Sequence, residues 1–386
     1  MNKKILIVSD FAYPLMGGTE WIVMGIAKYL TKKGFEVHII TPNWWYLKNK
    51  KFEDDVSFEN PTAGKKFFEI EKIKIHRFNW PLMRFGPSRI AGYISNIIRL
   101  DKKEDFGILH GFFIVAPMAA TITAGRILNK KKVLTLFEFE PLEEHFNNGV
   151  KRKIILDSLN KADAVTTLSF KLKERMQKYF PAVKINPVLG WNVSNYYRPL
   201  KINKPKEKII LFVGRISKQK GCHVLIKSMP KILKKAKCKL ILIGPQWEKE
   251  YFSKLIGELE LKNSVEFKGT FKREELIKYF NKATVTVLPS IRKEGFGMVL
   301  VEAMSCGCPI IGTNEGGIPD AIGNAGIIVP KNNSKKLAES IIKVLVDKKF
   351  YGNLRKKSLE RAKKFREEKI LGKYIEIYEG LINEKK

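Results

Sequence analysis

The chain has 386 residues, of which 44% are hydrophobic, so its composition is that of a globular protein rather than a disordered one. Its length predicts two domains, or three, and it has no run of eighteen apolar residues, which argues against a transmembrane helix. The formal charge of +33, from 72 Lys and Arg against 39 Asp and Glu, suits phosphates, anionic membrane surfaces or nucleic acid as partners. Because the basic residues are spread along the chain, a lysine-rich surface without a special partner is an equal alternative.

The N-terminus predicts a first strand and not a signal peptide, because its apolar run covers only residues 5–8 before polar residues interrupt it. The four cysteines show no CxxC spacing, and Cys306-Gly-Cys308 has a single residue between its thiols. We therefore expect a cytoplasmic protein with reduced, buried thiols and no metal site built from them.

The first βαβ unit contains a pair of glycines, Gly17-Gly18, between the strand at 5–8 and a helix whose apolar residues recur at helical spacing. A second strand follows at 35–40. Paired glycines at a helix entrance let backbone N–H groups approach an anion, although a plain tight turn is an equal alternative. The unit lacks GxGxxG and GxxxxGK[ST], which excludes a dinucleotide fingerprint and a P-loop.

Residues 89–99 predict an amphipathic helix with isoleucines on one side and arginines at its flanks. A basic amphipathic helix suits a membrane interface or a lipid acceptor. An ordinary helix that packs on a core is the alternative that we favour.

Two residues at predicted strand ends are candidates for the acceptor side of a binding site. His110 ends the strand at 106–110, and Glu138 follows the strand at 133–137 and opens an acidic loop in this basic protein. Open parallel sheets bind ligands at the carboxyl ends of their strands. A lone histidine is nevertheless more often structural than functional.

The basic, proline-containing segment 201–208 predicts a domain boundary. We expect an N-terminal domain over 1–200, a C-terminal domain over 207–368, and a closing helix within 369–386 that packs back on the N-terminal domain. The second half alternates short apolar strands with helices, which predicts a parallel doubly wound sheet. The fold class is therefore α/β, with two Rossmann-like domains facing each other across a cleft.

Two motifs in the second half point to chemistry. Arg215 and Lys220 lie between the strand at 209–213 and the next helix, where two cations and a helix N-terminus suit a phosphate. Further on, Glu294 and Glu302 stand eight positions apart around a glycine-containing turn, the first in a strand-to-helix loop and the second on the helix.

Together these motifs resemble those of the retaining glycosyltransferases of family 4, which use nucleotide sugars and have the two-domain GT-B fold. The resemblance covers nearly the whole chain, and the motifs occur in the expected order. They are the loop at Gly17-Gly18, Gly214-Arg215 with Lys220-Gly221, the E-x7-E motif from Glu294 to Glu302, and the Gly316-Gly317 turn.

The resemblance implies a role for each matching residue. Glu294 would bind hydroxyls of the donor sugar, and Glu302 would accept hydrogen bonds from the ribose. Arg215 and Lys220 would hold the diphosphate. Gly17 and Gly18 would approach the diphosphate from the other domain. The remaining contacts to the sugar and the diphosphate would come from backbone N–H groups of Phe296, Gly297 and Met298.

The implied mechanism is a front-side, oxocarbenium-like displacement in which the leaving phosphate helps to deprotonate the acceptor hydroxyl. The two glutamates would then be ligands of substrate hydroxyls and not an acid/base pair as in hydrolases. No D-x-D motif occurs, so we expect no catalytic metal and no other cofactor.

Departures from the family pattern fall in or beside the acceptor half: Phe112 stands where many members have a second histidine, and Phe137 where a histidine often ends the next strand. The expected substrates are a UDP- or GDP-hexose and a hydroxyl of a lipid-linked or growing glycan, handled at the cytoplasmic face of a membrane. The alternatives are a GT-B-fold nucleotide-sugar epimerase and, from the charge alone, a nucleic-acid-binding protein. No nucleic-acid motif supports the latter.

Overall fold

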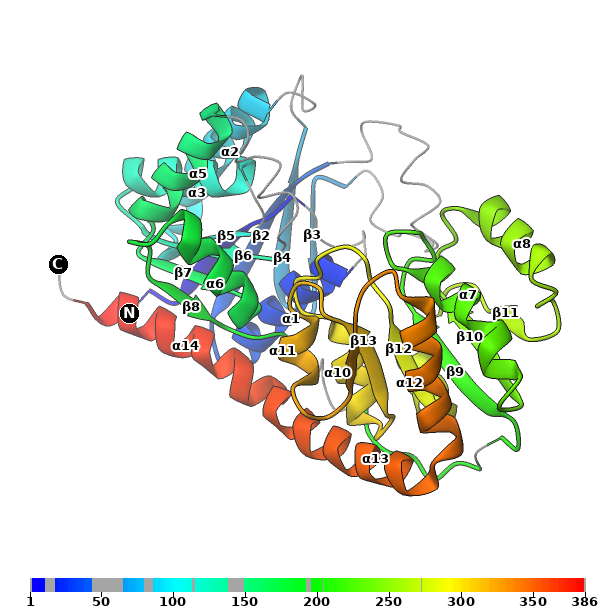
Figure 1. Ribbon diagram of the computed structural model, residues 1–386. Helices are drawn as coiled ribbons and strands as arrows, with labels where there is room; N and C mark the ends of the chain where they lie inside the picture. Colours follow the sequence, from blue (N-terminus) through cyan, green and yellow to red (C-terminus); the bar gives the residue numbers. More distant parts are fainter. Residues whose placement is uncertain are drawn as a thin grey trace. The chain divides into compact units, whose positions relative to one another are not determined.

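The computed structural model describes residues 2–10, 18–43, 65–79, 86–112, 115–137, 149–191, 196–203, 205–271 and 273–384. The chain divides into two compact units: unit 1 is Met1–Val188 with Leu371–Lys386, and unit 2 is Leu189–Ile370. Figure 1 shows the elements of both.

Unit 1 contains an eight-stranded sheet in the order β3-β4-β2-β1-β5-β6-β7-β8. All neighbours pair in parallel except β3 and β4, which form an antiparallel pair at one edge. The strands are β1 Lys4–Val8, β2 Glu36–Pro42, β3 Phe67–Ile70, β4 Ile73–Phe78, β5 Ile108–Phe112, β6 Lys131–Leu136, β7 Ala164–Thr167 and β8 Ile185–Pro187.

Helices cover both faces of this sheet, as expected for a mainly parallel sheet. The apolar clusters on one face join β-strand side chains to α2, α3, α5 and α6, whereas tyrosines of α14 contact β5 and β6 from the other face. The helices are α1 Gly18–Lys32, α2 Gly86–Glu104, α3 Ala116–Ile127, α5 Gly149–Lys161, α6 Phe170–Tyr179 and α14 Glu367–Asn383.

Unit 2 contains a six-stranded, wholly parallel sheet in the order β11-β10-β9-β12-β13-β14. Its strands are β9 Lys208–Val213, β10 Cys238–Ile243, β11 Val265–Phe267, β12 Val285–Leu288, β13 Ile310–Thr313 and β14 Ile327–Val329. Its helices are α7 Cys222–Leu233, α8 Lys249–Glu258, α9 Arg273–Lys282, α10 Met298–Ser305, α11 Ile318–Ile322, α12 Ser334–Val346 and α13 Lys348–Ala362, which a 3-10 turn η3 Lys363–Phe365 extends.

The prediction of two Rossmann-like α/β units is confirmed, but the chain enters unit 2 earlier than the segment 201–208. Trp191 is fully buried, and the Tyr197 ring packs edge-on against Phe280 of α9 with 5.6 Å between centroids. The Asn281 side chain accepts a hydrogen bond from Leu200 N (2.8 Å) and donates one to Arg198 O (3.0 Å). These contacts attach residues 197–200 to unit 2. The described residues of the later segment lie within unit 2 and not at its boundary.

The amphipathic helix predicted at 89–99 is the central part of α2, and its apolar side faces the core. Tyr93 and Ile97 are fully buried, and Ile90 and Ile94 pack against the same cluster. The favoured interpretation of an ordinary core-facing helix is confirmed. Among the described residues, no helix combines the length and apolarity needed to cross a bilayer.

Candidate active site

The sheet of unit 2 changes direction between β9 and β12. From β9 the chain proceeds outward to β10 and β11, then returns to β12 and proceeds to β13 and β14 on the other side. Ligands of open parallel sheets bind at the carboxyl ends of the two strands that flank such a point. The loop after β9 contains Lys220, and the loop after β12 contains Glu294, so the two residues that the sequence singled out lie at this position.

Lys220 and Glu294 form an ion pair there, with 2.6 Å between Lys220 Nζ and Glu294 Oε1. Ser290 Oγ donates a hydrogen bond to the same oxygen. The side chains of Lys220 and Glu294 are only 19% and 15% exposed. Burial by itself would raise the pKa of Glu294, but the Lys220 ammonium, the Ser290 hydroxyl and the Arg292 charge outweigh it and lower the pKa below its usual value. Glu294 is therefore an ionised acceptor of hydrogen bonds at neutral pH.

The two loops are held together by backbone contacts that require glycine. Gly221 has φ of 73°, and a Cβ there would collide with the carbonyl oxygen of Pro289. The backbone N–H groups of Ile291 and Arg292 donate to Gln219 O at 3.0 and 3.1 Å. The position of Lys220 relative to Glu294 is thus fixed by main-chain geometry and not by the flexible lysine stem.

The turn after β13 also contacts the loop that contains Glu294. Gly317 N donates to Glu294 O at 2.7 Å, and a Cβ on Gly316 would collide with the same carbonyl group. Thr313 Oγ1 donates to Ser290 O at 2.7 Å. The turn containing Gly316 and Gly317, which the sequence also indicated, therefore supports the main chain of Glu294 from behind.

The loop that contains Glu294 leads into helix α10, which begins at Met298. Gly297, with φ of 91°, is its N-cap and has no side chain to occupy the free N–H groups of the first turn. Met298 is the first helical residue, whereas the Phe296 ring is buried and packs edge-on against Phe365. Glu302 lies one turn further along α10 and is 5% exposed. The N-terminus of α10 therefore presents donors and a partial positive charge beside the ion pair.

Arg215 lies in the loop after β9 with its guanidinium over the Trp247 ring, 4.4 Å from the ring centroid. Arg215 and Lys220 are thus both in the loop that adjoins Glu294, as the sequence predicts. Among the residues that the sequence did not single out, Ser290 and Trp247 contact the predicted ones. Ser290 could have been noticed as the polar residue that ends the buried strand β12.

The other candidates lie in unit 1, and the structure describes only some of them. They are the acceptor-side candidates His110 and Glu138, and the glycines Gly17 and Gly18 that were predicted to approach the diphosphate. Gly17 and Glu138 are outside the described residues, and Gly18 is the first residue of α1. His110 is fully buried in β5, with Nε2 2.7 Å from Thr135 Oγ1 and Nδ1 in a hydrogen bond with the Tyr378 hydroxyl of α14. Burial holds the pKa of His110 well below its usual range. The ring is neutral and packed, and a role in acceptor binding stays a prediction.

The residue at the corresponding position of unit 1 is Asp10, which follows β1 where that sheet changes direction between β1 and β5. Tyr93 donates a hydrogen bond to Asp10 Oδ1 (3.2 Å), and Arg89 Nε lies 3.6 Å from the same oxygen. Burial raises the pKa of Asp10, although Arg89 and Tyr93 oppose the shift. Asp10 was not among the predicted site residues, although the polar pair Ser9-Asp10 after the first strand is a signal for it.

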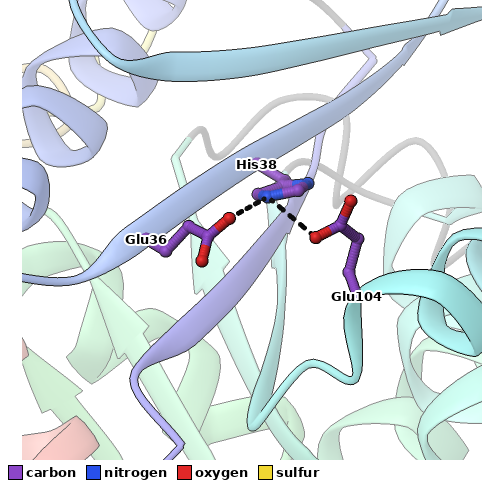
Figure 2. A group of neighbouring side chains, drawn as sticks. All are labelled: Glu36, His38 and Glu104. Carbon is purple, nitrogen blue, oxygen red and sulfur yellow. Dashed lines mark hydrogen bonds and ion pairs between the residues drawn. The ribbon is translucent and has the colours of Figure 1, made fainter.

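A second cluster of charged side chains lies at the opposite, amino-terminal edge of the unit 1 sheet (Figure 2). His38 Nε2 is 3.2 Å from Glu36 and 3.8 Å from Glu104, an arrangement that could hold a metal ion. Lys74 Nζ, however, lies 2.6 Å from Glu36, and Lys4 Nζ lies 3.2 Å from Glu104 and 3.5 Å from Glu36. Two ammonium groups already neutralise the two carboxylates, and a metal ion would have to displace both. The cluster fits a charge-paired network better than a metal site.

Comparison with known protein families assigns both halves of the chain. The model described as Glycosyltransferase Family 4 matches residues 16–188, and the model described as Glycosyl transferases group 1 matches residues 198–365. Together they account for most of the chain.

Individual relatives agree with the family models. The chain is 25% identical over its full length to the N-acetyl-alpha-D-glucosaminyl L-malate synthase of Bacillus anthracis, of which it covers 99%. It is 27% identical, over 93% of its length and 96% of the relative, to a Campylobacter jejuni N-acetylgalactosaminyltransferase whose name gives a diphospho-undecaprenol acceptor.

Solved structures show the same fold. A sucrose-phosphate synthase from Thermosynechococcus elongatus matches 99% of this chain and 100% of its own with a TM-score of 0.81 and 21% identity. The Anabaena protein HepE in complex with UDP matches 98% of this chain and 100% of its own with a TM-score of 0.74 and 18% identity. The chain therefore belongs to the family 4 glycosyltransferases and is an enzyme of that class with the GT-B fold.

Proposed function

We propose that this glycosyltransferase moves a hexose from a UDP- or GDP-sugar, with retention of configuration, to a hydroxyl of a lipid-linked or growing glycan. The observation that supports this most is the Lys220–Glu294 ion pair at the point where the unit 2 sheet changes direction, in the loop that leads into α10. A cation in contact with an ionised carboxylate, and the free N–H groups of the helix that follows that carboxylate in the chain, are what a sugar joined to a diphosphate requires.

In this proposal the donor lies along the edge formed by the loops after β9 and β12. The Glu294 carboxylate accepts hydrogen bonds from sugar hydroxyls, because it is ionised and held by Lys220 and Ser290. Lys220 and Arg215 bind the diphosphate. Glu302, further into the helix and nearly buried, binds the ribose.

The chemistry follows from where charge develops. When the bond between the anomeric carbon and the phosphate oxygen breaks, the diphosphate gains negative charge, and fixed cations and N–H groups stabilise it more than they stabilise the bound donor. The partial positive charge at the first turn of α10 also stabilises the negative charge on the leaving diphosphate. The leaving phosphate oxygen then accepts the proton of the acceptor hydroxyl that attacks the same face of the sugar. Glu294 is not needed as an acid, and the downward shift of its pKa supports the role of a hydrogen-bond acceptor.

The identity of donor and acceptor is a proposal supported by relatives. HepE has been solved with UDP and with UDP-glucose. The Campylobacter relative is named for a diphospho-undecaprenol acceptor, and another relative, CapM of Staphylococcus aureus, is named for capsular polysaccharide biosynthesis. These names favour a uridine nucleotide and a polyprenyl-linked or polysaccharide acceptor for this chain. None of these relatives is named as an epimerase.

The experiment is release of nucleoside diphosphate from candidate UDP- and GDP-sugars, measured with a coupled assay in the presence of polyprenyl-linked or oligosaccharide acceptors. Candidates are first ranked by the rise in melting temperature that each nucleotide sugar produces. We expect one donor to raise the melting temperature and to release its diphosphate only when an acceptor is present. Conversion of the sugar without any acceptor would favour the epimerase instead. If no nucleotide sugar changes the melting temperature or reacts, the proposal is wrong.

A further inference from the structure

The loop after β10 packs along the basic loop after β9. Ile216 N donates to Pro245 O at 2.8 Å, and Trp247 N donates to Ile216 O at 3.3 Å. At the base of the two loops, Gly244 approaches Gly214 so closely that a Cβ on Gly244 would collide with the Gly214 carbonyl oxygen. The main chains of the two loops are therefore fixed against each other, and the side chain at position 247 is placed beside Arg215.

Two basic side chains of the β9 loop each lie on an aromatic ring from the β10 side. The Arg215 guanidinium lies over the Trp247 ring at 4.4 Å, and Lys218 Nζ lies over the Tyr251 ring at 3.8 Å. Lys218 is held additionally by Glu248, which accepts a hydrogen bond from Lys218 N at 2.6 Å. The β10 loop and α8 thus hold two basic side chains of the β9 loop, of which Arg215 belongs to the proposed donor site.

The Trp247 ring is 48% exposed, which is unusual for the largest apolar side chain. Its ring contacts the cation of Arg215, and such contacts are strongest for arginine on tryptophan. An arginine side chain has several rotatable bonds, so a free guanidinium at the edge of the sheet would lose considerable entropy when it binds a phosphate. A ring that already restricts the guanidinium removes part of that loss.

We propose that Trp247 is a positioning residue that holds Arg215 in the orientation in which it binds the donor diphosphate. This inference rests on the proposed function, in which Arg215 binds the diphosphate. It differs from a stacking platform for the nucleobase, because the ring acts through the arginine and not on the nucleotide itself.

The test compares ligands with and without phosphates. Calorimetry measures the affinity of UDP or GDP, whichever binds the wild-type enzyme, and ligand-observed NMR measures the affinity of the matching nucleoside. We expect Trp247→Leu to weaken the binding of the nucleoside diphosphate by about two- to fivefold, the range of an exposed cation–π contact, and to leave the binding of the nucleoside unchanged. Trp247→Phe, which keeps a ring, should restore most of the affinity.

A double-variant cycle makes the test specific. Because Trp247 acts through Arg215, Trp247→Leu should cause no further loss of diphosphate affinity in the Arg215→Ala enzyme. Tyr251→Leu is the matched control: it removes a ring from the same side of the loop, and we expect the affinity for the diphosphate to stay within twofold of wild type. Thermal unfolding of every variant shows whether the fold is retained.

The outcomes separate the two ideas. If Trp247→Leu weakens the binding of the nucleoside and of the diphosphate equally, the ring contacts the base and the inference is wrong. The inference is also wrong if the losses of affinity in Trp247→Leu and Arg215→Ala are fully additive, or if Trp247→Leu binds the diphosphate as the wild-type enzyme does. If the wild-type enzyme binds neither UDP nor GDP, the proposed function itself fails, and the inference falls with it. If Arg215→Ala weakens the diphosphate while Trp247→Leu does not, only the positioning role is refuted.

Discussion

Lys220 Nζ lies 2.6 Å from Glu294 Oε1, although the two residues are 74 positions apart in the chain. The pair joins the loops after β9 and β12, and Ser290 completes it with a hydrogen bond to the same oxygen. Because both side chains are largely removed from solvent, the pair is ordered before any substrate arrives. Catalytic groups that need no rearrangement stabilise developing charge at the least cost.

We expect Glu294→Gln to lower kcat/KM for the true donor and acceptor by about a hundredfold or more, as loss of one well-placed polar group in an active site does. Glutamine keeps the size of the side chain but removes the negative charge that pairs with Lys220. It also replaces one of the two carboxylate oxygens that can accept hydrogen bonds from sugar hydroxyls. The measurement is release of nucleoside diphosphate with acceptor present.

Glu339→Gln is the matched control, because Glu339 pairs with Lys231 at 2.9 Å on an exposed surface of the same unit. Exposed pairs of this kind contribute about 0–1 kcal/mol to stability, and this variant should keep wild-type activity. Full activity of Glu294→Gln would show that the carboxylate is not part of the donor site.

The glycines behind Glu294 give a second prediction. Gly316→Ala places a Cβ against the Glu294 main chain at a position with φ of 55°, so both the collision and the strained backbone conformation oppose it. We expect the variant to lose activity through displacement of Glu294 and to unfold at a lower temperature.

Gly352→Ala provides the contrast, because Gly352 lies inside α13 and a Cβ there meets nothing within 4 Å. Alanine in an exposed helix interior is more favourable than glycine by about 0.5–1 kcal/mol. This variant should unfold at a slightly higher temperature with unchanged activity. Equal behaviour of the two variants in thermal unfolding and in the activity assay would contradict the close packing behind Glu294.

Most residues of this site could be predicted from the sequence because they follow the ends of strands. A short run of apolar residues followed by polar residues marks such a strand end. Glu294, Arg215 and Lys220 were found in that way. The contacts between these residues depend on which strands are neighbours and on main-chain packing at Gly221 and Gly316. The periodicity of apolar residues along the sequence gives information on neither.

Other elements escaped prediction for physical reasons that can be named. The β3–β4 hairpin turns at Glu71 and Lys72, both with positive φ, where the usual turn residues Gly and Asn are absent. The alternation of apolar and polar residues over Ile73–His76, which matches the alternating burial at the start of β4, was the available signal in the sequence. His110 shows the reverse problem: its place at a strand end suggested function, but the ring points to the face of the sheet that α14 covers, which only the tertiary structure reveals.

Tyr378 of helix α14 makes a hydrogen bond with His110 of β5, and this contact gives a third prediction. Tyr378→Phe removes the hydroxyl and leaves Nδ1 of a fully buried imidazole without that partner. An unsatisfied buried polar group costs about 1–3 kcal/mol, so the free energy of unfolding should fall by that amount in chemical denaturation.

Phe35→Leu is a suitable comparison, because Phe35 packs edge-on against the same Tyr378 ring without a hydrogen bond. It should leave the pKa and the tautomer of His110 unchanged, whereas Tyr378→Phe should alter the imidazole signals in NMR. An unchanged free energy of unfolding in Tyr378→Phe would mean that the hydrogen bond contributes nothing to the docking of α14.

The cluster shown in Figure 2 makes the stability of the enzyme depend on pH. His38 Nδ1 lies 3.0 Å from His76 Nε2, and the two rings are stacked. Burial, and then the neighbouring His38, lower the pKa of His76 to about 4. Since the unfolded chain binds the proton near pH 6.5 and the folded chain only near pH 4, the stability is complete above pH 6.5 and is lost as the pH falls from 6.5 to 4.

Glu36 adds a second step at lower pH. Its hydrogen bond with Lys74 is the main cause that lowers its pKa to about 2, so its contribution is lost between pH 4.5 and 2. We expect the free energy of unfolding, measured in urea at a series of pH values, to fall below pH 6.5. His76→Phe should reduce the slope between pH 6.5 and 4, where one proton accounts for at most about 1.4 kcal/mol per pH unit. An identical slope in wild type and variant would show that His76 does not titrate in this range.

A last prediction concerns the membrane. The apolar side of α2 is buried, so contact with a bilayer has to come from another surface. Helices α5 and α6 follow neighbouring strands and pack on the same core cluster, and their first turns expose Val150 (71%) and Phe170 (48%). Exposed Arg152 and Lys153 lie near the N-terminus of α5, where cations oppose the helix dipole and so weaken the helix. Basic and apolar side chains together at the surface suit an anionic bilayer.

We expect the enzyme to sediment with phosphatidylglycerol vesicles and not with pure phosphatidylcholine vesicles. Each basic residue near an anionic surface contributes about 1 kcal/mol, so the double variant Arg152→Glu/Lys153→Glu should bind the anionic vesicles at least tenfold more weakly. Lys234→Glu/Lys235→Glu changes the net charge equally at exposed positions of unit 2 and should bind as wild type does. If both double variants lose binding to the same extent, the overall charge and not the α5–α6 surface attracts the membrane. If neither loses it, basic residues elsewhere or apolar contacts alone account for the binding.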